Sequence, residues 1–419
     1  MIHDTDTQAS PVKNHGWAVT FAGMGVNLAL GVLYTWSVFK KNIPEEWGWR
    51  DRTLWPYAAA CLIFSLVMVP AGRMQDRLGP RLVATIGGVL VGAGMILASQ
   101  MTSLLGYVIG FGVLAGAGIG FGYASATPPA VKWFPAARTG LIAGLVVSGF
   151  GLASVYIAPL AAKLIETLGI ETTVLAFGIG FLVVVVGLAQ LLRPPPKGYV
   201  PAGTIPKPAG GPVRKEDFTP REMLKTWQFY LRWVTYACGA GAGLMIIGIL
   251  ADMAKTQAGI EIGFLLVAAL AVGNGAGRIV AGVVSDKIGR KMTLFAFFVM
   301  QAVLVFLVSR ATAGSALANV PALLVISALI GANYGANLSL FPSATKDYYG
   351  LKNFGVNYGL VFTAWGVGGF MLAMLAGFVR KATNSFDFAY YCSAALLVLA
   401  AVVTLLVKAP HHKLALPEG

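Results

Sequence analysis

The sequence is poor in charge and in the residue types that build cofactor and metal sites. Only 11% of its 419 residues are charged, 3 are cysteine and 4 are histidine. The three cysteines are isolated, so they offer neither a disulfide framework nor a metal-ligand spacing. All four histidines, His3, His15, His411 and His412, lie near the chain ends, which excludes a histidine relay inside an apolar segment. We therefore expect no metal and no cofactor.

Carboxylates are also missing from the middle of the long apolar segments. All 17 aspartates and glutamates fall in tails, in loops or at segment ends. No nucleophile–base pair or metal constellation is visible in these segments, so the sequence does not indicate an enzyme.

Hydrophobic residues make up 57% of the chain, too many for a soluble domain. Apolar runs of about 20 residues recur along it, and each can cross a bilayer core as a helix. The first run follows a polar tail without a small-residue cleavage site, so we expect it to be retained. The twelve predicted spans are residues 16–39, 53–73, 82–100, 104–126, 139–163, 172–192, 227–252, 262–284, 292–310, 320–345, 354–379 and 386–408.

The net charge is +14, and the distribution of the lysines and arginines indicates the orientation of the chain in the membrane. If both termini are cytoplasmic, 20 lysines and arginines lie on that side, 9 on the other side and 2 within spans. This follows the positive-inside rule and predicts a multi-pass protein of the inner or plasma membrane. No soluble module is present to carry a basic groove, so we expect no nucleic-acid binding.

A proline- and glycine-rich stretch divides the spans six and six. The predicted organisation is a cytoplasmic tail (1–15), a six-helix bundle (16–192), a cytoplasmic linker (193–226), a second six-helix bundle (227–408) and a cytoplasmic tail (409–419). Near the linker's end, TPRE at Thr219–Glu222 predicts a capping box that starts a short interfacial helix.

The two halves repeat each other. GRMQDRLGPR (Gly72–Arg81) and GVVSDKIGRK (Gly282–Lys291) are offset by 210 residues. Both follow the pattern Gly-x-x-x-Asp-(Arg/Lys)-x-Gly-(Pro/Arg)-(Arg/Lys). Gly140, Gly144 and Gly151 match Gly355, Gly359 and Gly366 at an offset of 215 residues. Parallel repeats of this kind are typical of transporters, with the substrate site near the midplane between the halves.

The twinned loop motif resembles the signature of the major facilitator superfamily along the whole chain. More narrowly, the chain is similar to the branch of monocarboxylate transporters and oxalate/formate exchangers. The residues that carry this likeness are GVLYTWSVF (Gly31–Phe39), WFPAARTGLIAGLVVSGFG (Trp133–Gly151), GNGAGRIVAG (Gly273–Gly282) and NYGLVFTAWGVGG (Asn357–Gly369). The resemblance implies an all-α membrane fold with twelve transmembrane helices in two six-helix bundles.

Arg278, in the eighth predicted span, is the first candidate for substrate binding. An intramembrane arginine costs about 2.5–3.5 kcal/mol on insertion scales, and such residues usually line a pathway. No deep carboxylate is available to pair with it, so its planar fork suits a substrate carboxylate. The resemblance agrees, since this branch holds the substrate carboxylate with an arginine in this span.

Two departures from the branch bear on coupling and substrate charge. Asn274 lies one turn before Arg278, where many monocarboxylate transporters have an aspartate; it could orient the guanidinium, touch substrate or only pack. Oxalate exchangers have a lysine where this chain has Trp365. A dianion would need two deep cations and this sequence offers one, which favours a monocarboxylate.

Other groups at a similar depth could shape the pocket or pack ordinarily. Phenols can hydrogen-bond a carboxylate or hydroxyl while their rings cover a methyl group. The aromatic candidates are Tyr34, Tyr123, Tyr334, Tyr358, Phe362 and Trp365, and the apolar-wall candidates are Leu28 and Leu145.

The remaining charged candidates lie at span ends. The resemblance implies that Asp76 and Asp286 make charge contacts that close the cytoplasmic side. Asp252 and Lys381 could pair as an outer gate or take part in proton coupling. Arg232 lies about one turn into its span, so we expect it to snorkel to the cytoplasmic face.

These observations together predict a carrier of small monocarboxylates such as L-lactate. We expect proton symport, from the resemblance, and alternating access, with the protein acting as a monomer in the lipid bilayer. An organic anion antiporter of the oxalate/formate type is the alternative within the same class. A non-transporting carboxylate receptor is the alternative of another class.

Overall fold

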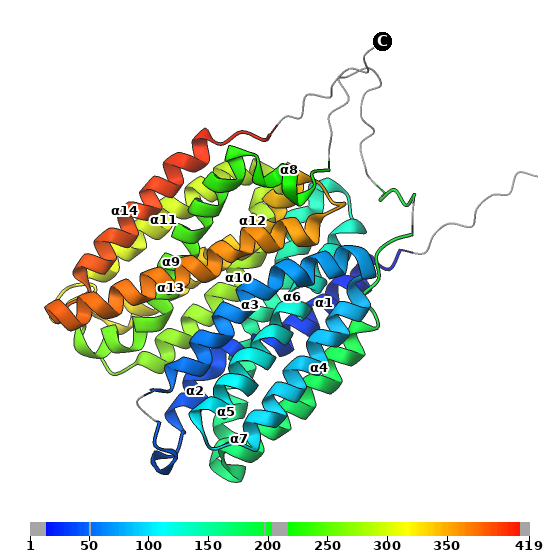
Figure 1. The fold of residues 1–419 in the computed structure, drawn as a ribbon. Helices are drawn as coiled ribbons and strands as arrows, with labels where there is room; N and C mark the ends of the chain where they lie inside the picture. Colours follow the sequence, from blue (N-terminus) through cyan, green and yellow to red (C-terminus); the bar gives the residue numbers. More distant parts are fainter. Residues whose placement is uncertain (1–13, 50–51, 197, 203–216, 411–419) are drawn as a thin grey trace, which may run out of the picture.

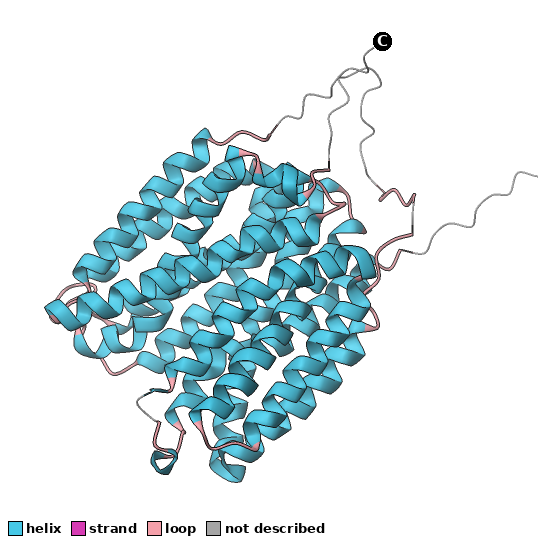
Figure 2. Cartoon of the chain, viewed as in Figure 1, coloured by secondary structure: helices cyan, strands magenta, loops and turns pink. Residues whose placement is uncertain are grey.

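The structure, a computed structural model, describes residues 14–49, 52–196, 198–202 and 217–410. All regular structure within these ranges is helical (Figure 2). Both the first helix and the last one have their free end toward the upper and right part of Figure 1. We call this the terminal side and the other the opposite side. Most of both predicted tails and residues 203–216 of the predicted linker lie outside the described residues.

The N-terminal bundle contains the first half of the described helices. Its first crossing is interrupted by a 3-10 turn, and its fourth by a π-helical stretch. The elements are α1 (Gly16–Leu30), η1 (Gly31–Thr35), α2 (Trp36–Lys41), η2 (Glu45–Trp47), α3 (Leu54–Leu78), α4 (Pro80–Ser99), α5 (Leu104–Tyr107), η4 (Val108–Ala115), α6 (Gly116–Lys132), η5 (Ala136–Arg138) and α7 (Thr139–Ala189).

Helix α7 comprises two crossings that meet at a sharp reversal. It is 51 residues long, and Gly169 inside it has φ 80° and ψ 165°, a conformation that only glycine adopts readily. The structure has 11 helices long and apolar enough to span a membrane, one of which contains this reversal. The described chain therefore crosses twelve times, as the hydropathy pattern predicts.

The C-terminal bundle follows a short helix, α8 (Pro220–Leu224). The predicted capping box is confirmed: Thr219 Oγ1 accepts from the Glu222 N–H, and Glu222 Oε2 accepts from the Thr219 N–H at 2.8 Å. The bundle's elements are α9 (Trp227–Thr256), α10 (Gly263–Ile288), α11 (Arg290–Arg310), α12 (Val320–Tyr349), α13 (Phe354–Thr383) and α14 (Asp387–Leu406).

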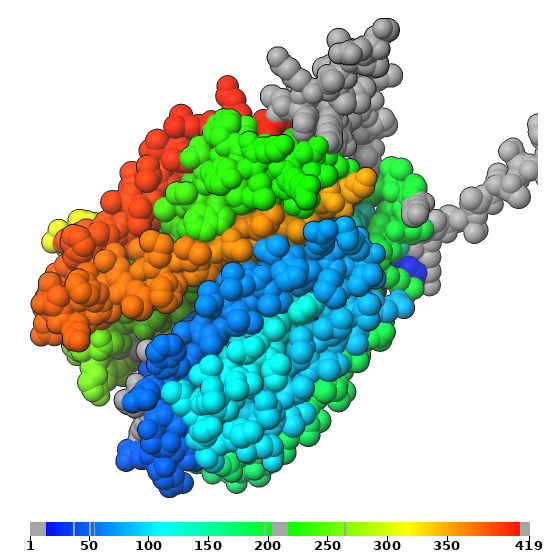
Figure 3. All heavy atoms as spheres, in the orientation of Figure 1, coloured from blue at the N-terminus to red at the C-terminus, as the bar shows by residue number. Residues whose placement is uncertain are grey.

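Two helix pairs make the most extensive contacts between the bundles. Helix α3 lies against α13, and α7 lies against α10. In Figure 1 the blue α3 runs beside the orange α13, and Figure 3 shows their side chains meeting along much of that seam. A Cβ on Gly72 would lie 2.2 Å from Gly355 O, and one on Gly282 would lie 2.2 Å from Gly140 O. The repeated glycines therefore permit two equivalent backbone contacts between the bundles.

Large apolar side chains cover the outside of the helices. This is expected where hydrocarbon replaces water as the solvent, because exposed apolar surface then carries no penalty. Examples at least half exposed are Phe21, Trp55, Leu105, Val183, Phe370 and Phe378.

Candidate substrate-binding site

Arg278 lies wholly inside the protein, on α10 where it faces α7. Its Nε donates to Asn274 Oδ1 at 3.0 Å, and its Nη1 donates to Val147 O of the other bundle at 2.5 Å. Its Nη2 is buried and has no hydrogen-bond partner, and no ion pair among the described residues involves it. A buried guanidinium with one free nitrogen is electrostatically incomplete and suits an anionic ligand.

Glycine makes the room for this side chain. A Cβ on Gly151 would lie 3.0 Å from Arg278 Nε and 3.2 Å from Asn274 Cγ. Asn274 holds Nε, as one of the sequence hypotheses has it, so the remaining edge of the guanidinium is fixed in direction. The repeated glycine motif in α7 thus has a local purpose beside the arginine.

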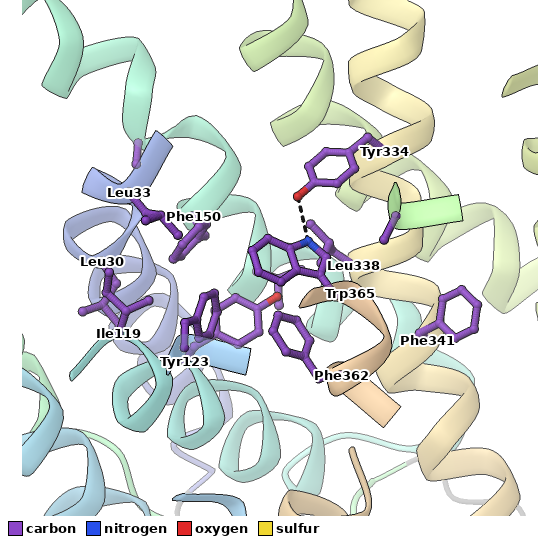
Figure 4. Packing of buried hydrophobic residues seen from close by; sticks show 14 of the residues in the cluster. Leu30, Leu33, Ile119, Tyr123, Phe150, Tyr334, Leu338, Phe341, Phe362 and Trp365 are labelled. Carbon is purple, nitrogen blue, oxygen red and sulfur yellow. Dashed lines mark hydrogen bonds between the residues drawn. The ribbon is translucent and has the colours of Figure 1, made fainter. Parts of the chain in front are cut away.

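A small, tightly packed cavity lies next to Arg278, between the bundles. Its gaps amount to about 150 Å³ and admit no water-sized sphere, so a substrate can enter only if the surrounding side chains move apart. Arg278 is the one charged residue that lines it. The lining residues are Tyr34, Phe64, Tyr123, Phe150, Arg278, Leu338, Phe362 and Trp365. Figure 4 shows Tyr123 and Phe150 facing Trp365 and Phe362 across the bundle interface.

A chain of hydrogen bonds crosses the interface above this cavity. Tyr34 and Tyr334 join their hydroxyls at 2.7 Å, and the Trp365 indole donates to Tyr334 Oη at 2.9 Å (Figure 4). The Tyr34 ring also packs edge-on against Phe150 at 5.0 Å. Because Tyr34 belongs to the N-terminal bundle, whereas Tyr334 and Trp365 belong to the other, this chain of hydrogen bonds joins the bundles beside Arg278.

Five of the ten predicted pocket residues line this cavity, namely Arg278, Tyr34, Tyr123, Phe362 and Trp365. The other five, Asn274, Tyr334, Tyr358, Leu28 and Leu145, do not line it. The Leu28 side chain is half-buried and its carbonyl accepts from Tyr156 Oη. Leu145 is also half-buried, on a helix whose cavity-lining residue is Phe150. Phe64, Phe150 and Leu338 are lining residues that sequence reasoning missed. The sequence of a uniformly apolar helix does not distinguish the face toward the cavity from the face toward lipid.

Asp76 and Asp286 bridge the bundles on the terminal side, each by accepting hydrogen bonds from the first turn of a helix in the other bundle. Asp286 accepts from Gly140 N–H at 2.9 Å and Leu141 N–H at 2.8 Å. Asp76 accepts from Gly355 N–H and Val356 N–H, each at 3.0 Å. A carboxylate is stabilised at a helix N-terminus by the free N–H groups and the helix dipole. The repeated motif therefore forms two matching cross-bundle locks.

The lock at Asp286 is part of an ion-pair network within its own bundle. Arg290 Nη1 lies 2.6 Å from Asp286 Oδ1, and Arg290 Nε lies 3.0 Å from Asp347 Oδ2. Arg290 also donates to Ser285 Oγ. Arg290 thus holds the Asp286 carboxylate toward α7.

Replacing Asp286 with alanine is expected to separate the bundles on the terminal side. Losing charge-assisted bonds worth about 2 kcal/mol would shift a two-state equilibrium roughly 30-fold. Spin labels at exposed Leu78 and Ile288, in a background without native cysteines, would report longer distances by double electron–electron resonance. Glu261→Ala, which breaks the exposed Lys255–Glu261 ion pair within one bundle, should leave the distances unchanged. Equal shifts in both variants would contradict the lock.

The pair predicted on the opposite side is not formed in this structure. Both Asp252 and Lys381 are exposed. Ion pairs on this side include Lys255–Glu261 at 2.9 Å and Lys163–Glu166 at 3.6 Å. A role for Asp252 and Lys381 therefore stays a prediction.

The expectation that Arg232 snorkels to the surface is wrong. Its side chain is 6% exposed, and its guanidinium lies over the Tyr348 ring, 3.8 Å from the centroid. Its Nε and Nη1 are buried without hydrogen-bond partners. The aromatic face supplied by α12 takes the place that water would have at the interface.

The comparisons with known proteins agree with this architecture. The family description "Major Facilitator Superfamily" matches residues 18–260 and 233–419, so the chain belongs to this superfamily of transporters. It is 28% identical over 355 residues to the uncharacterized MFS-type transporter YhjX of Escherichia coli, covering 84% of this chain and 85% of that protein. The fold is therefore the major facilitator fold of two six-helix bundles.

Two further relatives are named as transporters of organic acids. The chain is 27% identical to the oxalate:formate antiporter of Oxalobacter formigenes, covering 80% of this chain and 77% of that one. It is 24% identical to monocarboxylate transporter 13 of Rattus norvegicus, covering 98% and 92%.

Solved structures share the fold at low identity. The transporter FucP in its outward conformation superposes with a TM-score of 0.65 at 15% identity, covering 93% of this chain and 99% of that one. The proton:xylose symporter XylE gives a TM-score of 0.69 at 12% identity, covering 95% and 97%. The chain is thus a multi-pass membrane transporter of this superfamily, similar in sequence to carriers of monocarboxylates and oxalate.

Proposed function

We propose that the protein is a secondary carrier of small monocarboxylates such as L-lactate, coupled to protons and working by alternating access. The observation that carries the proposal is the free Nη2 of fully buried Arg278, beside a tightly packed cavity with no other charge in its lining. A single carboxylate would complete the guanidinium, and its short carbon chain would lie among aromatic rings.

The neighbours of Arg278 have distinct parts in this proposal. Asn274 fixes the guanidinium, and the Tyr34–Tyr334–Trp365 chain closes the site around bound substrate. Phe362 stacks on Trp365 at 5.3 Å and supplies an apolar wall. Such a site binds one charge tightly and admits little bulk.

Opening would alternate between the two sides. The locks at Asp76 and Asp286 hold the terminal side closed while the opposite side opens, and their release would expose Arg278 to the terminal side. The distribution of lysine and arginine supports cytoplasmic termini in an inner or plasma membrane. Arg278 cannot itself lose a proton usefully, so the proton travels with the substrate or through an end group such as Asp252.

Exchange of organic anions is the second candidate, favoured by the likeness to the oxalate:formate antiporter. Trp365 counts against a dianion, because its ring stacks on Phe362 and its indole bonds Tyr334 where a second cation would be needed. Arg232, the other buried arginine, is not among the residues lining the cavity.

Uptake of labelled L-lactate into proteoliposomes separates these mechanisms. An inward proton gradient should drive accumulation above the equilibrium level in the absence of internal substrate, and a protonophore should abolish it. Uptake only after preloading with formate or oxalate would instead establish exchange. Binding without accumulation under either condition would identify a receptor.

A further inference from the structure

Three buried tyrosines surround Phe362, one of the rings that line the cavity. The ring centroids of Tyr123, Tyr358 and Tyr236 lie 5.4, 5.7 and 6.3 Å from that of Phe362. None of the three side chains is more than 4% exposed. Tyr123 comes from α6 of the N-terminal bundle, whereas Tyr236 and Tyr358 come from α9 and α13 of the other.

The three hydroxyls lie next to one another yet lack well-formed hydrogen bonds. The Tyr358 hydroxyl is close to those of both Tyr123 and Tyr236. All three oxygens are buried and without a partner, as is Arg278 Nη2. A buried polar group left unsatisfied costs about 1–3 kcal/mol, so a cluster of them normally receives a ligand or water.

Other packing does not account for this cluster. The Tyr107 hydroxyl is also buried without a partner, but its ring packs with Trp36, Trp47 and Trp49, among no other phenols. The Phe362 cluster differs because three such hydroxyls, from both bundles, lie together, and those of Tyr123 and Tyr236 are within electrostatic range of Arg278. The free donors therefore form two groups, one at the arginine and one at the phenols.

We infer that Tyr236 and Tyr358, together with Tyr123, form a second polar subsite that receives a hydroxyl or carbonyl oxygen of the substrate beyond its carboxylate. The inference rests on the proposed function and narrows the substrate class to oxygen-bearing short acids, such as hydroxy and oxo acids. Because the subsite contains phenols of both bundles, it is complete only when the bundles are closed around the substrate. The second oxygen thus favours the occluded state as well as binding.

Comparing L-lactate with propionate, which lacks the hydroxyl, tests this subsite in proteoliposomes of the full-length protein. The wild type should transport lactate with the higher Vmax/KM. Tyr236→Phe and Tyr358→Phe should each lower the lactate-to-propionate ratio about 3- to 10-fold, the worth of one hydrogen bond, while Vmax/KM for propionate stays near wild type. Tyr107→Phe removes an equally buried free hydroxyl elsewhere and should leave the ratio unchanged.

Several outcomes would overturn the inference. Equal Vmax/KM values of the wild type for the two acids would do so without any variant. An unchanged ratio in whichever phenol variant remains monodisperse, or an equal loss for both acids, would also do so. If Arg278→Gln abolishes transport of both acids while the wild type ignores the hydroxyl, only the subsite fails. If wild-type uptake of both is absent, the proposed function itself fails.

Discussion

Replacing Arg278 with glutamine is expected to abolish carboxylate transport. Removing one partner of a buried, hydrogen-bonded charge pair costs about 2–5 kcal/mol, which is roughly 30- to 5000-fold in Vmax/KM. Arg278→Lys keeps the charge but loses the planar fork, so we expect it to retain more activity than glutamine and less than arginine. Initial rates of labelled L-lactate uptake measure both variants.

Stability provides the control for this prediction. In the substrate-free protein Arg278 is a buried cation without a counter-ion, so glutamine should leave the thermal unfolding midpoint unchanged or raise it. A variant that loses transport and also unfolds at a much lower temperature would point to a structural arginine. A stable, inactive variant is what the account expects.

Placing leucine at Gly282 is expected to prevent closure of the terminal side and to reduce transport at least about tenfold. A Cβ here meets the Gly140 carbonyl oxygen at 2.2 Å, and backbone cannot yield as a flexible side chain does. The helices α7 and α10 must then separate, which removes the Asp286 bonds to α7 as well. Labelled-substrate uptake measures the loss, and the distance between labels on Leu78 and Ile288 measures the separation.

A second glycine provides a matched control for the Gly282→Leu substitution. Gly180 lies on α7 with nothing within 4 Å of an added Cβ, so Gly180→Leu makes the same change on an open surface. It should transport at the wild-type rate. Wild-type transport by Gly282→Leu would mean that the cycle does not require this backbone contact.

The membrane crossings and the deep burial of Arg278 could be predicted because a single energetic term dominates each of them. A bilayer core fixes the length of an apolar segment, and the cost of an intramembrane charge singles out the arginine. The sequence repeat between Gly72–Arg81 and Gly282–Lys291 is also a structural repeat, since equivalent residues make equivalent cross-bundle contacts. These inferences need no knowledge of which way a side chain points.

The pocket walls could not be predicted in the same way. Every face of these helices is apolar, so no periodicity told Leu28 and Leu145 from the cavity-lining Phe64 and Phe150. The partners of Asp76 are backbone N–H groups, which have no signature in the sequence. Arg232 was misjudged because its stabilising ring, Tyr348, belongs to a distant helix. The depth of a charged residue within a span determines the energetic cost of its charge. The side chains on neighbouring helices determine in which direction the charged side chain points.

Equilibrium binding of radiolabelled L-lactate to the purified protein, read by scintillation proximity, tests the central claim most directly. The account predicts saturable binding by the wild type that unlabelled lactate displaces, and none by Arg278→Gln over the same concentrations. Wild-type-like binding by the glutamine variant would contradict it, because the carboxylate would then be held somewhere other than the free edge of Arg278.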